Sequence, residues 1–153
     1  TGMRVSEIAA LRYSDAVDNN GEVRREIQLR AEDTKTNEAR IVFVNDKLHK
    51  ELTKYVTAFK PINANVKLFY SQKRNSDGFT PNTLAQMFHY LYSRCGLKGA
   101  SSHSARRTFI TNLANKGVGV RVLASLAGHK SIAVTQKYID VNDDMKRNAV
   151  ELV

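Results

Sequence analysis

The stretch LAGHKSIAVTQKY occupies residues 126–138, and in it Gly128-His129 separates two short helical patterns ahead of Tyr138. It lies at the end of a longer run, residues 78–139, which contains eight Lys or Arg and no Asp or Glu. So long a stretch without a carboxylate indicates an anionic partner. Histidine and tyrosine side chains can move protons or attack phosphorus, so the pattern favours a partner that is cut as well as bound.

The composition is that of a basic globular protein. Its 153 residues are enough for one compact domain, and a hydrophobic content of 42% with a mean hydropathy of -0.41 is ordinary for such a domain. Lys plus Arg number 24 against 15 Asp plus Glu, which gives a net charge of +9 and a pI near 9.8. This balance favours nucleic acid as the partner, although a solvated Lys-rich surface produces the same charge.

Cysteine content and hydropathy narrow the class further. Cys95 is the only cysteine, so the chain forms no internal disulfide and no thiolate zinc site. No apolar run approaches the ~20 residues that span a bilayer, and the sequence contains no signal-peptide pattern. We therefore expect a protein of the reducing cytoplasm that has no membrane contact. Because the first residue is Thr1 rather than Met, we also expect a piece of a longer protein.

The N-terminal part predicts a helix followed by a β-hairpin. Apolar residues at helical spacing indicate a short helix over residues 4–11, and Asn19-Asn20-Gly21 indicates a turn. Residues 23–29 and 40–44 have strand patterns and are joined by a polar loop. We expect an antiparallel hairpin with Lys35 near its tip.

Capping signals divide the remainder into helices. The expected boundaries are Asn45 or Asp46 to Phe59, Thr80-Pro81 to Gly96 with a buried stripe of Leu84, Met87, Phe88 and Leu91, Ser102 to Gly117 with Phe109, Ile110 and Leu113 inward, residues 118–126, and Ser131 to Tyr138. Residues 67–78 are polar and irregular, and the tail from Asp140 is helical. The pattern predicts a mainly α protein with a small antiparallel β-sheet (α+β).

Two short motifs carry groups suited to phosphate chemistry. His103 and Arg106 are three residues apart near a predicted helix start, so they share a face, and Arg107 competes for that face. A planar guanidinium matches two phosphate oxygens, and an imidazole moves a proton near neutral pH. An exposed His and Arg on a surface helix is the simpler interpretation of this motif taken alone.

Gly128-His129 and Tyr138 also have two interpretations each. Glycine permits close backbone approach and His129 can donate to a phosphate oxygen, but a plain turn between helices has the same pattern. Tyr138 is a candidate nucleophile only in the company of these groups, because most tyrosines pack in the core or at its rim.

Five segments distributed along the chain occur in a recognisable order. They are Thr1-Gly2-Met3-Arg4-Val5-Ser6-Glu7-Ile8-Ala9-Ala10-Leu11, Thr34-Lys35-Thr36, His103-Ser104-Ala105-Arg106, Leu126-Ala127-Gly128-His129-Lys130-Ser131-Ile132 and Thr135-Gln136-Lys137-Tyr138. Together they resemble the tyrosine recombinases, or phage-type integrases, over about residues 1–141. Each segment alone is modest, but their joint occurrence in family order is specific.

The resemblance implies that a DNA strand is cleaved without water, metal or other cofactor. By it, Tyr138 attacks a DNA phosphate to form a 3′-phosphotyrosine and frees a 5′-hydroxyl. Arg4 and Arg106 match the two arginines that hold the non-bridging oxygens, and His129 matches a donor to the same phosphate. The attacked phosphodiester gains negative charge in the transition state, so preorganised cations and donors are the groups that it needs.

The remaining matched positions assist this reaction. The resemblance implies that Lys35 protonates the leaving 5′-oxygen, although Lys47 and Lys50 are rivals for that role. His103 matches a proton acceptor for Tyr138, and Glu7 matches a supporting acidic position. The sequence departs from the family pattern at Ala105, where a larger residue is commoner, and at Arg107, where many members have His.

The resemblance also implies the setting of the reaction. We expect residues 1–153 to form a single catalytic domain, truncated at its N-terminus because the family's DNA-clamping domain is absent. The expected partner is double-stranded DNA, on which the full-length protein assembles as a tetramer. The expected role is integration or excision for a phage or mobile element in a bacterial cytoplasm, at the nucleoid.

Two alternatives remain beside site-specific recombination. A type IB-like topoisomerase uses the same nicking and resealing chemistry without exchanging partners, but the order of Gly-His and Tyr favours a recombinase. A non-catalytic basic DNA-binding module would have the same charge and only surface acid–base groups. Formation of a covalent DNA adduct distinguishes the recombinase and the topoisomerase from the non-catalytic DNA-binding module.

Overall fold

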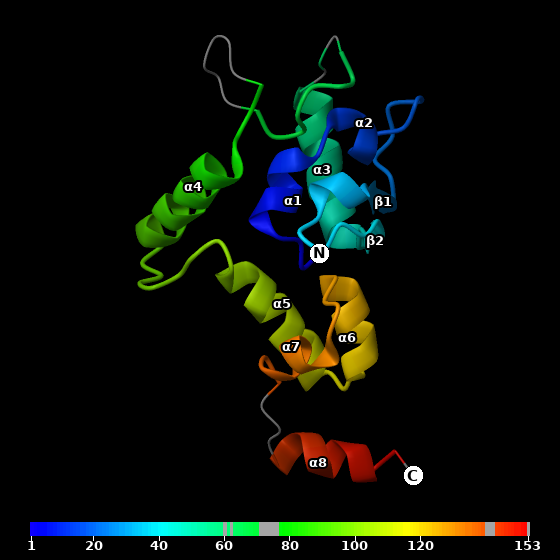
Figure 1. Ribbon diagram of the computed structural model, residues 1–153, viewed down its shortest axis with the longest axis vertical. Helices are drawn as coiled ribbons and strands as arrows, with labels where there is room; N and C mark the ends of the chain where they lie inside the picture. Colours follow the sequence, from blue (N-terminus) through cyan, green and yellow to red (C-terminus); the bar gives the residue numbers. More distant parts are fainter. Residues whose placement is uncertain (60, 62, 71–76, 140–142, 153) are drawn as a thin grey trace. The chain divides into compact units, whose positions relative to one another are not determined.

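The computed structural model describes residues 1–59, 61, 63–70, 77–139 and 143–152. Across these residues the chain is mostly helical and contains one two-stranded antiparallel sheet (Figure 1). The elements are α1 (Val5–Ala10), α2 (Tyr13–Ala16), β1 (Glu26–Leu29), η1 (Ala31–Asp33), β2 (Arg40–Phe43), α3 (Asp46–Ala58), α4 (Pro81–Arg94), α5 (Ser104–Asn115), α6 (Val120–Ala127), α7 (Ile132–Gln136) and α8 (Asp143–Val150). The predicted class, mainly α with a small antiparallel sheet, is confirmed.

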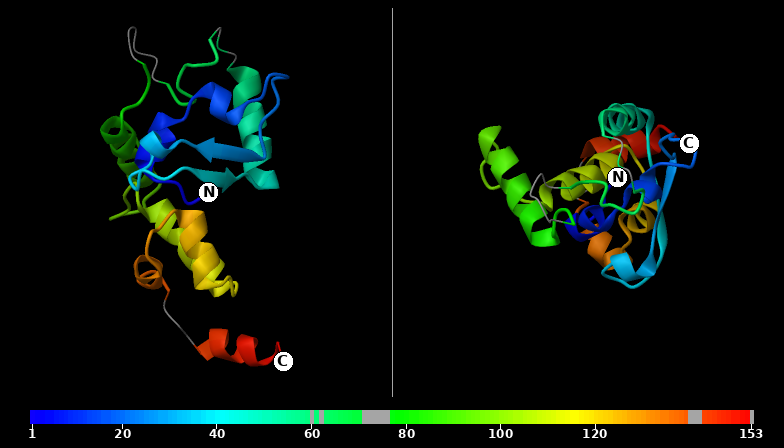
Figure 2. Two further views of the ribbon diagram at one scale, coloured as in Figure 1. Left: turned by 45° about the vertical axis from the view of Figure 1, so that its right-hand side comes forward. Right: turned by 90° about the horizontal axis from the view of Figure 1, so that it is seen from above.

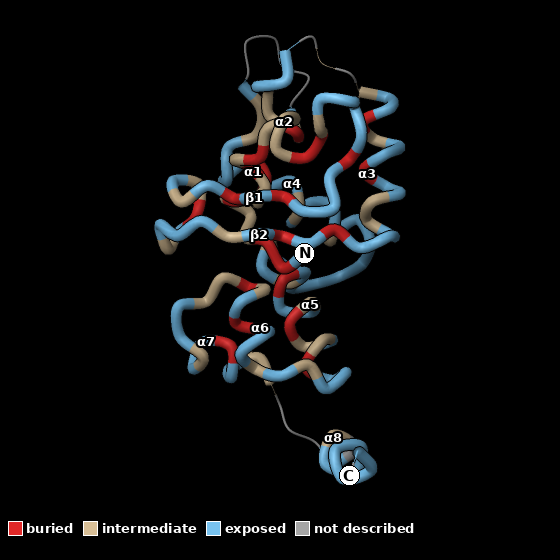
Figure 3. The backbone as a smooth tube through the Cα atoms, turned by 90° about the vertical axis from the view of Figure 1, so that its right-hand side faces the viewer, coloured by how far each residue is buried: buried red, intermediate tan, exposed pale blue. Residues whose placement is uncertain are grey.

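Two compact units make up the described structure. We call Met3–Ser102 the hairpin unit, and Thr1–Gly2 together with His103–Val153 the C-terminal unit. Each unit contains its own buried residues (Figure 3). The interpretation of residues 1–153 as a single catalytic domain stays a prediction.

The hairpin of β1 and β2 forms one wall of the core in the hairpin unit. The strands pair antiparallel with Glu26 opposite Phe43, and side chains alternate so that Ile27, Leu29 and Val42 are buried. The predicted hairpin is therefore confirmed, with Lys35 in the loop between its strands. The first strand is shorter than predicted, and a 3₁₀ turn, η1, occupies part of the loop.

Helix α3 packs against this hairpin, as the left view of Figure 2 shows. Asn45 caps the helix by accepting a hydrogen bond from the Leu48 N–H at 2.9 Å, as the sequence predicts. Leu52 and Val56, four residues apart on one face, are buried in the same cluster as the inward residues of the hairpin. The core of this unit therefore lies between a strand face and a helix face.

The structure corrects the predicted buried stripe of α4. Thr80 caps this helix and Pro81 begins it, as predicted. Of the stripe only Leu84 is buried, whereas Met87 and Leu91 are 40% and 41% exposed. Helix α4 packs against α1, which has only six residues and therefore cannot cover a helix of fourteen.

The C-terminal unit contains helices α5 to α8, and its buried residues include Ile110 on α5 and Leu123 and Ala127 on α6. The predicted Ser102 cap is wrong: His103 occupies the N-cap position of α5 without a side-chain cap bond. The predicted helix through Tyr138 begins as expected, with the Ala133 N–H donating to Ser131 Oγ, but it ends at Gln136.

The tail contains a helix, α8, over Asp143–Val150, while residues 140–142 of the predicted helical tail lie outside the described residues. Residues 71–76 of the predicted irregular segment also lie outside them. No helix in the described part of the chain has the length and apolar character needed to cross a membrane.

Candidate active site

Arg106 is a buried arginine of α5 with a fixed guanidinium plane. It is only 6% exposed, its Nη1 donates to the carbonyl oxygen of Gly2, and its Nη2 donates to that of Ala127 at 2.6 Å. A buried guanidinium requires such partners, because an unsolvated charge is costly. These two carbonyls hold Arg106 in one orientation within the C-terminal unit. Gly2 is 104 residues away from Arg106 in sequence, and Ala127 is 21 residues away.

Gly2 has to be glycine for this contact to form. Its φ is +66°, and a Cβ atom at this position would lie 2.6 Å from Cδ1 of Phe109. The sequence shows Gly2 within the first family segment but does not indicate this role. Its fit against α5 explains how the carbonyl of Gly2 reaches Arg106.

His129 lies in the turn between α6 and α7, where two features set its position. Gly128 has a left-handed φ of 64°, which ends α6, and the His129 N–H bonds back to the carbonyl oxygen of Ala124 at 2.9 Å. The ring Nδ1 lies 2.8 Å from Oγ1 of Thr135, a residue that is fully buried. The backbone of His129 and one side of its ring are therefore both constrained.

Tyr138 lies directly beyond α7 and next to His129. The two rings stack with centroids 6.0 Å apart and an angle of 17° between their planes. The Tyr138 carbonyl oxygen accepts a hydrogen bond from Thr111 Oγ1 at 3.2 Å, which joins this turn to α5. The side chain is half-buried, so the phenol is placed by local contacts and remains partly exposed to solvent.

The two adjacent arginines of α5 lie in different environments. Arg106 is buried, whereas Arg107 is exposed and its Cζ lies 6.0 Å from the centroid of the Tyr138 ring, a cation–π arrangement. His103 lies exposed at the N-cap position of α5, three residues before Arg106, and the predicted shared face stays a prediction. The C-terminal unit therefore brings His129, Tyr138 and Arg107 together.

Arg4 and Glu7 meet in the hairpin unit, together with an arginine that the sequence did not single out. Glu7 is fully buried; its Oε1 lies 2.9 Å from Arg4 Nη1, and its Oε2 lies 2.7 Å from Arg40 Nη2. The N–H of Arg4 also donates to Glu7 Oε2 at 2.7 Å, which caps α1. Glu7 therefore orients Arg4 through both its main chain and its side chain.

The charge state of Glu7 follows from these contacts. Burial raises the pKa of the carboxyl, while the Arg4 N–H and the guanidinium groups of Arg40 and Arg4 lower it more strongly. The net effect is a pKa below the ordinary value of 4.5. Arg40 was interpreted from the sequence as a strand residue only, since nothing local indicates an ion pair 33 residues away.

Lys35 is exposed in the hairpin loop, and its neighbour Thr34 organises that loop. The buried Thr34 hydroxyl lies 2.9 Å from the Ala31 carbonyl oxygen and 3.0 Å from that of Glu38, and it accepts from the Glu38 N–H at 3.1 Å. Lys47 and Lys50, the rivals for its role, lie exposed on α3. The loop thus presents Lys35 from a fixed backbone.

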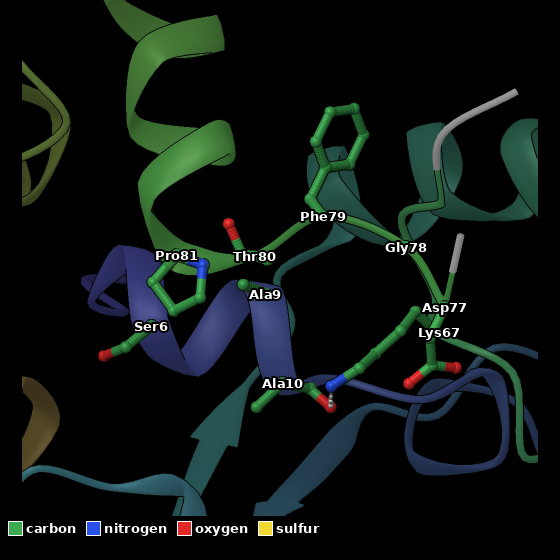
Figure 4. Close-up of a pocket in the computed structure, with 9 residues that line it drawn as sticks. All are labelled: Ser6, Ala9, Ala10, Lys67, Asp77, Gly78, Phe79, Thr80 and Pro81. Atoms are coloured by element: carbon green, nitrogen blue, oxygen red, sulfur yellow. Dashed lines mark hydrogen bonds between the residues drawn. The ribbon is translucent and has the colours of Figure 1, made fainter. Parts of the chain in front are cut away.

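The hairpin unit also contains a pocket of about 280 Å³ beside α1 and α4 (Figure 4). Ser6, Ala9, Thr80 and Pro81 contribute to its lining, and Lys67 reaches across to donate to the Ala10 carbonyl oxygen at 3.3 Å. None of the predicted site residues lines this pocket. Within the described residues there is also no group of three or more His, Cys, Asp or Glu that could hold a metal ion.

Comparison with known proteins defines the class. The model of the phage integrase family matches residues 1–145. A tyrosine recombinase of Pseudothermotoga lettingae is 31% identical over 150 residues, which are 97% of this chain and 49% of the relative. The tyrosine recombinase XerA of Saccharolobus solfataricus is 32% identical over 149 residues, or 97% of this chain and 45% of the relative.

Solved structures agree with the sequence comparison. A crystal structure of XerA recombinase is 29% identical and superposes with a TM-score of 0.76, covering 99% of this chain and 53% of that one. The Tn1549 transposon integrase, in complex with transposon right end DNA, is 22% identical with a TM-score of 0.74 over 99% of this chain and 54% of that one, which supports the fold alone.

The fold is thus that of a tyrosine recombinase catalytic domain. The chain belongs to the phage integrase family, as its five sequence segments indicated. It spans about half the length of the curated relatives that it matches.

Proposed function

We propose that this chain supplies the catalytic domain of a site-specific tyrosine recombinase, which cuts and rejoins DNA through a 3′-phosphotyrosine link. The observation that carries the proposal is the placement of Tyr138. Its half-buried phenol ring stacks on His129 at 6.0 Å and lies under the guanidinium of Arg107, in a chain that matches the family over residues 1–145. A tyrosine that only fills space in the core or at its rim would not require a histidine and an arginine against its ring.

The proposed reaction is a transesterification in which one P–O bond replaces another. The Tyr138 oxygen attacks phosphorus, the bond to the 5′-oxygen breaks, and the phenol proton passes to His103. Lys35 delivers a proton to the leaving 5′-oxygen. Because the phosphotyrosine preserves the phosphodiester bond energy, the reverse attack by a 5′-hydroxyl rejoins the strand without ATP.

The remaining residues stabilise charge on the attacked phosphate. Arg4 and Arg106 bind the non-bridging oxygens, and His129 donates to the same group from its ring. Oriented donors at a developing oxyanion typically contribute about 10²–10³ in rate each. The contacts of Glu7 with Arg4, and of the Gly2 and Ala127 carbonyls with Arg106, support these roles because they hold each guanidinium in place before substrate binds.

The substrate is double-stranded DNA in this proposal, and the full-length protein acts as a tetramer on it. Support comes from the acid-free run over residues 78–139 and from relatives solved with DNA, among them XerH bound to a palindromic difH substrate in a post-cleavage complex. By the same resemblance the protein serves a phage or mobile element and works at the nucleoid in a bacterial cytoplasm.

Covalent capture of DNA tests the proposal. We would incubate the chain with a pool of duplexes that have a nick and randomised sequence around it, because loss of the short product traps a covalent intermediate. The expected result is a protein–DNA adduct that survives denaturation with the wild-type chain and is absent with Tyr138→Phe. Tyr92→Phe on α4 is the matched control and should leave the adduct unchanged.

Two outcomes would overturn the proposal. An adduct that persists in Tyr138→Phe would show that another residue is the nucleophile. Binding of the pool without any adduct from the wild-type chain would identify a non-catalytic DNA-binding module instead. Sequencing the captured duplexes would also identify the preferred target.

A further inference from the structure

Thr135 is a buried threonine beside His129, and the family resemblance assigns it no function. It lies on α7 three residues before Tyr138, its side chain is fully buried, and its Oγ1 is 2.8 Å from His129 Nδ1. Its main-chain carbonyl oxygen also accepts from the Tyr138 N–H at 3.0 Å. One residue thus contacts both the imidazole and the peptide of the proposed nucleophile.

The hydrogen bond matters because a neutral imidazole carries its hydrogen on one nitrogen only. If Thr135 donates to Nδ1, the hydrogen must be on Nε2, and Nε2 is then a donor. If Nδ1–H instead donates to the hydroxyl, Nε2 of the neutral ring is an acceptor and would repel a phosphate oxygen. The partner of one ring nitrogen therefore decides what the other can do.

We propose that Thr135 is the positioning residue for His129: its hydroxyl donates to Nδ1 and keeps the ring hydrogen on Nε2, ready for a phosphate oxygen. This inference rests on the proposed function, in which His129 donates to the attacked phosphate. Threonine suits the task because its branched Cβ restricts χ1, so the buried hydroxyl has few alternative positions. Stacking on Tyr138 restrains the same ring from its face.

Three variants separate positioning from packing. Thr135→Val has nearly the same shape without the hydroxyl, Thr135→Ser restores the hydroxyl, and Thr57→Val changes an exposed threonine of α3 as the matched control. On a nicked duplex recovered from the pool, Thr135→Val should slow single-turnover adduct formation by about 10- to 100-fold, the loss typical when a metal-binding histidine loses its orienting partner. Thr135→Ser and Thr57→Val should react near the wild-type rate.

A double-mutant cycle tests whether Thr135 acts through the histidine. In a His129→Ala background, Thr135→Val should produce no further loss of rate, because the ring that it positions is gone. The same fold-loss in both backgrounds would overturn the proposal and assign Thr135 a packing role only.

The tautomer can be measured without DNA, which keeps this inference distinguishable from the proposed function. In the ¹⁵N spectrum of the chain, which has four histidines, His129 is assigned by comparison with His129→Ala. We expect the Nε2–H form in the wild-type chain and Thr135→Ser, and a mixture of forms in Thr135→Val. An Nδ1–H form in the wild type would overturn the proposal even if adducts form.

Absence of adducts with an Nε2–H histidine would instead point to failure of the proposed function. Should Thr135→Val not fold, as judged by circular dichroism, the spectra of the wild type and Thr135→Ser still decide the tautomer.

Discussion

The buried carboxylate of Glu7 has two guanidinium partners, Arg4 and Arg40, and this ion-pair network holds the Arg4 side chain in place within the hairpin unit. The guanidinium side chains are 16% and 11% exposed, so both charges are largely removed from water. Removing one member of such a buried network is strongly destabilising, because the remaining buried charges lose an ionic partner. Glu7 was predicted as a supporting residue, and its contacts provide a physical reason for that prediction.

We expect Glu7→Gln to lower the free energy of unfolding by about 3 kcal/mol, since it removes the buried carboxylate charge that both guanidinium groups contact. Urea unfolding at pH 7 measures this loss. Glu51→Gln is the control, because its pair with Lys54 is 60–62% exposed, and such a surface pair contributes no more than about 1 kcal/mol. Equal losses in the two variants would show that the buried Glu7 network contributes no more to stability than an exposed pair.

The difference in free energy of unfolding between the wild type and Glu7→Gln should depend on pH. The pKa of Glu7 lies below 4.5 in the folded chain, so its ionised form stabilises the fold. That contribution is fully present when the pH lies above the pKa of Glu7 in the unfolded chain, and it is lost as the pH falls through the pKa in the folded chain. The stability difference between wild type and Glu7→Gln should therefore be constant near neutrality and shrink below about pH 4.5. A difference that grows on acidification would contradict the pKa direction.

Arg106 and Arg107 should respond differently to replacement by alanine. Arg106→Ala leaves the Gly2 and Ala127 carbonyls without their donor, and each buried unsatisfied group costs about 1–3 kcal/mol. Arg107 is exposed, so Arg107→Ala should change stability by less than about 0.5 kcal/mol. Thermal unfolding checks both values.

Adduct formation then assigns the phosphate clamp. Arg106→Lys keeps the charge but not the planar fork, and we expect it to lose most adduct formation while remaining folded. Arg107→Lys should retain more activity than Arg106→Lys. The reverse order would transfer the clamp role to Arg107, the residue that lies over Tyr138.

At the scale of elements, short connections position three of the candidate residues, whereas Arg106 lies on helix α5. His129 lies in a glycine-terminated turn between α6 and α7, Tyr138 follows α7 directly, and Lys35 lies in the loop between β1 and β2. Loops carry functional groups well only when something fixes their backbone. In the hairpin loop the hydroxyl of Thr34 does so, by bonding to both ends of the segment.

Replacing Thr34 by valine should therefore loosen the loop without disturbing the sheet. We expect a stability loss of about 1–2 kcal/mol from the lost hydrogen bonds of the buried hydroxyl and faster hydrogen exchange of backbone amides over residues 31–38. Exchange in β1 and β2 should stay slow. Thr36→Val, two residues along the same loop, is the control; if it accelerates exchange as much, Thr34 has no special role.

At the scale of the whole molecule, positive charge is unevenly distributed along the chain. Residues 78–139 carry eight Lys or Arg and no acidic residue, so this run supplies eight of the nine net positive charges. The other residues have 16 basic and 15 acidic side chains, which nearly balance. A polyanionic partner is attracted by such an asymmetry, and the proposed DNA substrate is such a polyanion.

Predictions from sequence succeeded where the determining contacts are local. Caps at Asn45, Thr80 and Ser131 were predicted correctly because each contact spans two or three residues. The hairpin was predicted from alternation on both sides of one loop. Serine is a good N-cap residue, and Ser102 was predicted to cap α5. The helix instead begins at Ser104, and His103 occupies the N-cap position.

Burial was harder to predict, because periodicity shows which residues share a helix face but not how much of that face another element covers. The stripe of α4 has the correct spacing, yet Met87 and Leu91 remain exposed. Arg106 and Arg107 differ by one position, or about 100° around the helix, and the chain pattern could not say which would be buried.

The linear sequence by itself determines the order and spacing of the chemically active residues, the helix starts and the family of the chain. Each of these depends on neighbouring residues or on a series of matching segments. The environment of those residues is a property of the fold. Contacts such as Arg40 with Glu7 and the Gly2 carbonyl with Arg106 join positions 33 and 104 residues apart. Such pairs form only when packing brings distant backbone together, and no local pattern encodes the distance between them.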